Sequence, residues 1–191
     1  MPASNTVKIF QQLVFWLLLI SSPASAETFS IESAQVSPIG NGRVLNAKIE
    51  YPLTLRVREA LSNGVPITFY QQFKLISSIP LLGKYWQWEE SLWTTEIRYK
   101  LRYHALTEQY ILVALDTRHH RSFSSLDAAL NALGLIENLS LPPEHLNKPE
   151  NLRLELRSGL DLNALPTPMR PGALISRKWQ LTSPWAIAQW L

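Results

Sequence analysis

The sequence predicts a mainly β domain, antiparallel and sandwich-like, with two short α-helices; a domain of the α+β class is the alternative. Two observations support this prediction. Apolar and polar residues alternate along several runs, which is the pattern of strands that bury one face, and only two segments show helical spacing. Turn clusters at 38–42 and 104–108 separate neighbouring runs, and we expect about seven short strands.

Four runs alternate along their length, and a fifth is apolar throughout. The alternating runs lie at 45–51, 65–76, 93–103 and 152–160. In the 93–103 run the aromatic and aliphatic residues share one face, and charged residues occupy the other. The fifth run, 110–115, is apolar on both faces, so we place it centrally in a sheet.

Two segments predict short helices. In 54–63 the apolar residues recur at helical spacing, and Gly64 stands where a C-terminal cap is expected. The second helix starts at a capping box, with Ser124 as the cap and Asp127 as its partner, and ends at Gly134. Both helices are too short to be stable alone and must pack on the sheets.

Two later stretches read as irregular. Residues 137–151 are rich in Asn, Pro and Glu, which predicts a surface loop. Pro166, Pro168 and Pro171 predict a rigid, extended stretch, because proline fixes the backbone and restricts the residue before it.

The first 26 residues have the features of a secretory signal peptide. Lys8 gives a basic start, residues 13–20 are apolar, and Ala24 and Ala26 form a small-residue cleavage site. The competing interpretation is a membrane anchor. A membrane-spanning helix requires about 20 apolar residues, and the apolar run here is far shorter. We therefore expect export to the periplasm with cleavage after Ala26. Residues 27–191 then form one domain without a transmembrane segment.

Composition and motifs exclude several kinds of site. The chain of 191 residues has no cysteine, which excludes disulfides, iron–sulfur clusters and thiol catalysis. Its net charge of +3 is too small to indicate nucleic acid. We find no nucleophile elbow, P-loop or Rossmann glycine pattern, and so expect no enzyme and no cofactor. Adjacent His119 and His120 point to opposite faces of a strand, so we interpret this cluster as a solvated turn rather than a metal site.

Two features are candidates for a partner surface. Arg98, Lys100 and Arg102 form a basic stripe on one strand face, which suits an acidic partner, an anionic lipid or a glycan. Trp86 and Trp88 lie in an aromatic segment, and exposed tryptophans occur at sugar, membrane and protein contacts. The alternative for the basic stripe is a strand face turned to solvent, and the alternative for the tryptophans is a corner of the core.

Four stretches of the chain carry a family resemblance: LSNGVPI (61–67), RYKLRYHALTEQY (98–110), SFSSLDAAL (122–130) and LDLNALPTP (160–168). Their order and spacing resemble a proteobacterial family of exported proteins that is classed as a domain of unknown function. The resemblance spans roughly residues 28–185. It implies a signal peptide and genes commonly placed beside a sensor kinase and response regulator of the nitrogen-regulation type, and it defines no catalytic residue.

These observations favour a non-enzymatic periplasmic module that binds an envelope protein, with the extracytoplasmic part of a sensor kinase as the candidate partner. A module that binds cell-wall glycan or lipid through Trp86, Trp88 and the basic stripe is the alternative. An envelope hydrolase would need a polar pocket that the sequence does not reveal.

Overall fold

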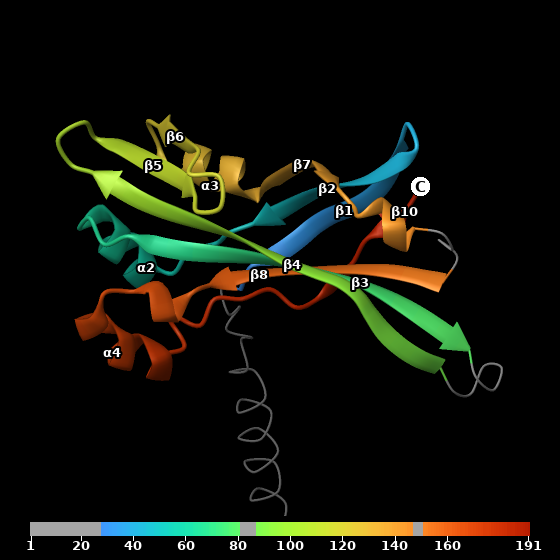
Figure 1. The fold of residues 1–191 in the computed structure, drawn as a ribbon. Coiled ribbons are helices and arrows are strands. Elements are labelled where there is room, and N and C mark those ends of the chain that lie inside the picture. The colour runs from blue at the N-terminus through green and yellow to red at the C-terminus, as the bar shows by residue number, and fades with distance from the viewer. Residues whose placement is uncertain (1–27, 81–86, 147–150) are drawn as a thin grey trace, which may run out of the picture.

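Two β-sheets face each other across one core in the computed structural model, which describes residues 28–80, 87–146 and 151–191 (Figure 1). One sheet has the strand order β10-β1-β2-β7, and the other has the order β6-β5-β4-β3-β8-β9. The described strands pair antiparallel except for β1 and β10. The prediction of a mainly β, antiparallel fold is confirmed. The predicted signal peptide lies outside the described residues.

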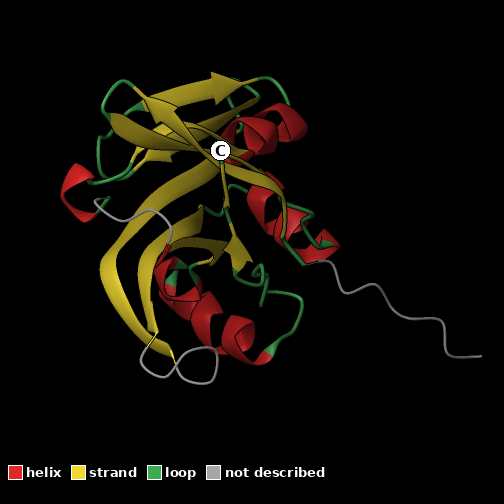
Figure 2. Cartoon of the chain, turned by 90° about the vertical axis from the view of Figure 1, so that its right-hand side faces the viewer, coloured by secondary structure: helices red, strands yellow, loops and turns green. Residues whose placement is uncertain are grey.

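The six-stranded sheet is built on a long hairpin. Its strands are β3 (Ile67–Pro80), β4 (Gln87–His104), β5 (Gln109–Ala114), β6 (His120–Phe123), β8 (Leu152–Leu160) and β9 (Ala186–Ile187). The two longest strands, β3 and β4, pair with each other and curve strongly along their length (Figure 2). On β3 the alternating residues Phe69, Phe73 and Leu75 are fully buried, which confirms the predicted periodicity.

The four-stranded sheet is smaller. It consists of β1 (Ser30–Ile39), β2 (Gly42–Glu50), β7 (Leu135–Ser140) and β10 (Gln189–Trp190). The predicted turn between the first two strands contains Gly40, whose φ of +54° favours glycine. Strand β7 corrects the prediction of a loop over 137–151. It pairs only with β2, so its other edge tolerates the polar residues that suggested a loop.

The core between the sheets contains three aromatic rings. Phe29 lies 4.8 Å from Tyr51, centroid to centroid, and 6.0 Å from Phe69; the Tyr51 and Phe69 rings are 5.3 Å apart. Two of the three contacts have edge-to-face geometry, which the ring quadrupoles favour. These rings join the two sheets at the point where β2 ends and β3 begins.

A polar network lies beside these rings. The amide of Gln71 donates to the Tyr51 hydroxyl and to the Leu133 carbonyl, each at 2.9 Å. The same hydroxyl lies 2.9 Å from the hydroxyl of Ser158, which also bonds the Tyr70 carbonyl. Burial raises the pKa of Tyr51 to about 12 despite these hydrogen bonds. The network gives partners to the Gln71 amide nitrogen and to both hydroxyls, and it leaves the Gln71 side-chain oxygen without one.

Three α-helices are described: α2 (Leu55–Ser62), α3 (Leu126–Gly134) and α4 (Arg170–Ile175). The first two confirm the predicted helices, and Gly64 follows α2 with φ +81°, as a C-terminal cap does. The cap of α3 is Ser125 rather than Ser124, because the Ser125 hydroxyl accepts from the Ala128 amide at 3.2 Å.

Two further predictions need correction. The proline-rich stretch is not extended: Thr167–Met169 is a 3₁₀ turn that leads into α4, and Pro171 lies in the first turn of α4, where a missing amide hydrogen costs nothing. The sequence predicts a central strand for residues 110–115, and as β5 they do pair with a strand on each side. That strand is second from the edge of its sheet, however, and within it only Leu112 is buried.

The C-terminal segment connects the two sheets. Residues 186–187 form β9 on the edge of β8, and residues 189–190 then form β10 on the edge of β1. Before β9, the Ser183 amide donates to the Ser158 carbonyl at 2.7 Å. One short segment therefore closes one side of the sandwich.

Candidate functional site

The predicted basic stripe lies on the face of β4 that points away from the core. Register pairs Lys100 with Thr68 and Arg98 with Tyr70, whereas the intervening Tyr99 faces the buried Phe69. Arg98, Lys100 and Arg102 thus share one outer face of the six-stranded sheet. Whether this face is a partner surface stays a prediction.

Arg98 forms ion pairs with neighbouring residues of the protein itself. It forms an ion pair with Glu96 and a second with Asp161 at 3.3 Å. Partial burial disfavours the ionised Glu96, but hydrogen bonds from Gln72 and Arg98 and the charges of Arg98 and Arg157 outweigh it and lower the pKa of this carboxyl. The hydrogen bond with Glu96 raises the pKa of Arg98 in turn.

Trp88 lies on the opposite face from the stripe. The β3–β4 register shifts between the pairs Leu75–Trp93 and Ile76–Ser91, and this bulge reverses the sides of β4 beyond it. Trp88 is 59% exposed on that other face, and it lies ten positions from Arg98, about 33 Å along the strand. Trp86 lies outside the described residues. The two parts of the predicted surface therefore do not meet in one site.

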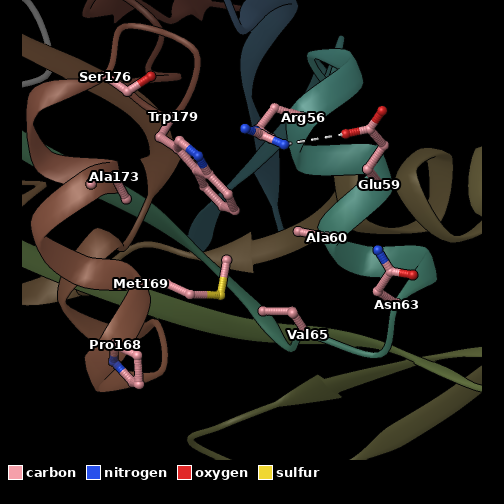
Figure 3. Close-up of a pocket in the computed structure, with 11 residues that line it drawn as sticks. Arg56, Glu59, Ala60, Asn63, Val65, Pro168, Met169, Ala173, Ser176 and Trp179 are labelled. Atoms are coloured by element: carbon pink, nitrogen blue, oxygen red, sulfur yellow. Dashed lines mark ion pairs between the residues drawn. The ribbon is translucent and has the colours of Figure 1, made fainter.

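A groove between α2 and α4 is a further candidate site, with a volume of about 560 Å³. Its residues come from α2, the turn after it and the segment around α4: Arg56, Glu59, Ala60, Asn63, Val65, Pro168, Met169, Gly172, Ala173, Ser176 and Trp179. Trp179 and Met169 point from the α4 side toward α2 (Figure 3). Ala60, Val65, Met169 and Trp179 contribute apolar lining, and the Arg56–Glu59 pair lies on the α2 wall.

Specific hydrogen bonds hold the two walls of this groove. Thr54 caps α2 by accepting from the Val57 amide, and its hydroxyl also donates to the Lys178 carbonyl at 2.8 Å. On the opposite wall, the Arg170 guanidinium donates to the Leu165 carbonyl at 2.7 Å. One threonine therefore links the start of α2 to the turn that carries Trp179.

The surface around the groove combines aliphatic side chains with positive charge. Leu174 and Ile175 on α4 are 49% and 86% exposed, and Leu55 on α2 is 72% exposed. Leu55 lines a second hollow of about 530 Å³, which shares Arg56 and Glu59 with the groove. The exposed cations of this region are Arg56, Arg170, Arg177 and Lys178. We call this region, with the groove, the helical end.

The histidine cluster shows no metal site in the described part of the chain. His119 and His120 are exposed, and no group of three or more His, Asp or Glu side chains there could hold a metal ion. Among the same residues, no helix has the length and apolar content needed to span a membrane.

Sequence reasoning missed the helical end. Its groove forms where residues 56–65 meet residues 168–179, which are far apart in the sequence. The local signals were the predicted helix at 54–63, the proline-rich stretch, and two of the stretches that carry the family resemblance, 61–67 and 160–168.

Comparisons with known proteins give one match. The model of the family described as "Domain of unknown function (DUF4390)" matches residues 26–189. A search of curated proteins and a search of solved structures each found no match.

Proposed function

The chain belongs to the family described as Domain of unknown function (DUF4390), and we propose that it is a non-enzymatic, exported binding module for a protein of the bacterial envelope. One observation carries this proposal: the two helices that form the groove, α2 and α4, also expose the large aliphatic side chains of Leu55, Leu174 and Ile175. Clustered apolar side chains at a surface mark contacts with other macromolecules.

The chemistry of the helical end favours a protein partner over a sugar. Its exposed apolar residues are the aliphatic Leu55, Leu174 and Ile175 rather than aromatic platforms. Exposed aliphatic side chains beside a hollow, with charged residues around them, match the composition of a protein interface, which has an apolar centre and a polar rim. The buried Trp179 and the adaptable Met169 supply a floor onto which such an anchor can pack.

The charge of the helical end predicts the sign of the partner. Arg56 and Glu59 line the groove as an ion pair, and Arg170, Arg177 and Lys178 are further exposed cations on α4 and in the segment after it. An acidic segment with an aliphatic anchor is therefore the complementary ligand, and opposite charge would also speed its association. The extracytoplasmic part of a sensor kinase is our candidate for the protein that carries this segment.

A transcription reporter under control of that kinase tests this function. Strains would carry I175D, L106D or a deletion of the gene. Leu106 is a matched control because it is 93% exposed in the β4–β5 turn, outside the helical end. We expect I175D to reproduce the deletion and L106D to behave as wild type. A deletion without effect on the reporter removes the kinase as partner, and an I175D strain that matches wild type while the deletion changes expression overturns the role of the helical end.

Export is the second part of the proposal, and the apolar run at 13–20 with Ala24 and Ala26 supports it. We expect a periplasmic fraction to contain a protein whose N-terminal residue is Glu27. Recovery of the chain in the cytoplasm with residues 1–26 intact would contradict this part.

A glycan- or lipid-binding module is the second candidate function. Lys100 and Arg102 favour it, because neither takes part in an ion pair among the described residues. Sedimentation with purified peptidoglycan, or with vesicles of anionic phospholipid, tests it. Binding that K100Q/R102Q abolishes would support this function, and a protein that stays in the supernatant would exclude it.

A further inference from the structure

A second charged site lies on the outer face of the six-stranded sheet, around Trp185. Lys74 on β3 is paired with Glu155 on β8, and Gln72 is paired with Arg157, so Lys74 and Arg157 are diagonal neighbours on one face. The Lys74 ammonium and the Arg157 guanidinium carbon each lie 4.5 Å from the centre of the Trp185 ring. The indole of Trp185, which lies in the C-terminal segment, thus makes cation–π contacts with two cations.

The carboxylates of this face form their ion pairs with other arginines, although the charge of Arg157 also acts on Glu96. Arg153 pairs with Glu155 at 2.8 Å and with Glu89 at 3.0 Å. Glu96 and Asp161 both pair with Arg98, as described above. The ion pairs among the described residues therefore include neither Lys74 nor Arg157.

A hydrogen bond orients Arg157 toward this site. Its Nε donates to the Gln72 side-chain oxygen at 2.7 Å, while the Gln72 amide donates to Glu96. This arrangement fixes the plane of the guanidinium through Nε. Arg157 and Trp185 are both partly exposed, so a small solute can reach them.

Two like charges held this close repel each other. Since each lies 4.5 Å from the same ring centre, they are at most about 9 Å apart, which is within about one Debye length at 0.1 M salt. The face of the indole attracts each cation, but it carries no net charge to neutralise the pair. An oxyanion bound at these heads would do so through charge-assisted hydrogen bonds.

We propose that Lys74, Arg157 and Trp185 form a binding site for an oxyanion, the phosphate or carboxylate group of an envelope ligand. This site lies on the same sheet face as the basic stripe but uses none of its residues. It is independent of the helical end.

The indole N–H resonance of Trp185 in a proton–nitrogen NMR spectrum of the purified protein tests the proposal, with W185F used for assignment. The probes are sodium phosphate and sodium glucuronate, each compared with sodium chloride at equal ionic strength. We expect a saturable shift of this resonance with one or both probes. The tighter probe identifies the source as a phosphate-bearing or a uronic acid-bearing ligand.

Variants separate this site from general electrostatics. K74Q and R157Q should each weaken binding at least threefold. The matched control is R43Q, because Arg43 lies 5.3 Å from the ring of Trp190, an indole contact with one cation. R43Q should bind as wild type, and Trp190 should not respond to either probe. Unchanged resonances of the other indoles show that each variant is folded.

Four results would overturn the proposal. They are the absence of a saturable shift with either probe, a shift that sodium chloride reproduces at equal ionic strength, equal weakening by R43Q and R157Q, and an equal shift with neutral N-acetylglucosamine.

Discussion

Replacement of Gly134 by alanine tests how closely α3 packs against the four-stranded sheet. A Cβ atom at this position would lie 2.1 Å from the Ile49 carbonyl oxygen and 3.2 Å from its carbon. Both atoms are backbone, so no side-chain rotation relieves the overlap and either α3 or β2 must move. Overpacking of this kind costs about 3 kcal/mol at the upper end of its usual range.

The better helix propensity of alanine offsets part of this cost, by about 1 kcal/mol. We therefore expect G134A to lower the free energy of unfolding by about 2 kcal/mol. Urea denaturation followed by tryptophan fluorescence would measure this, and an m-value of about 2 kcal/mol/M gives a midpoint lower by roughly 1 M.

Gly172 provides the matched control for this substitution. It lies in α4, and an added Cβ would meet nothing within 4 Å. G172A should therefore raise the free energy of unfolding by about 0.5–1 kcal/mol through helix propensity alone. If G134A raised the midpoint as G172A does, or left it unchanged, the close approach of α3 to β2 would be refuted.

Four further substitutions test other parts of the fold. S125A should cost about 1 kcal/mol of unfolding free energy and S124A almost nothing, because Ser125 caps α3; equal midpoints in urea would contradict this. Y51F should cost about 1–2 kcal/mol, because it removes a buried hydroxyl that bonds Gln71 and Ser158; an unchanged midpoint would exclude the network. Glu96 has a lowered pKa when folded, so its stabilising contribution is present above the unfolded value near 4.5 and is lost as the pH falls through the folded value. As the pH is lowered from 5 to the folded pKa of Glu96, the free energy of unfolding of E96Q should therefore fall less than that of wild type, as measured by urea titration at each pH. Equal falls in the two proteins would contradict the ion pair.

The strands could be predicted from the sequence because their signal is local. Alternation along β3 and β8 reports directly which side chains face the core, and the predicted run at 152–160 coincides with β8. Single positions were harder: adjacent serines both fit a cap, and only the geometry distinguishes Ser125 from Ser124. Helix α4 was missed because Pro171 in its first turn, with Pro166 and Pro168 before it, read as a helix breaker.

The candidate sites depend on contacts between distant segments, which no local pattern reports. The bulge near Leu92 moved Trp88 to the face opposite Arg98, and alternation alone would have kept them together. The groove needs α2 beside α4, and Trp185 reaches Arg157 because the last strands cross between the sheets.

Site-specific photocrosslinking in living cells tests most directly whether the helical end is the partner surface. A photoreactive amino acid would replace Ile175 in one strain and Leu106 in another, since both side chains are exposed. We predict that one envelope protein is captured from position 175 and not from position 106, and that R177E/K178E reduces this product. Equal capture at both positions, or no product from position 175, would contradict the account.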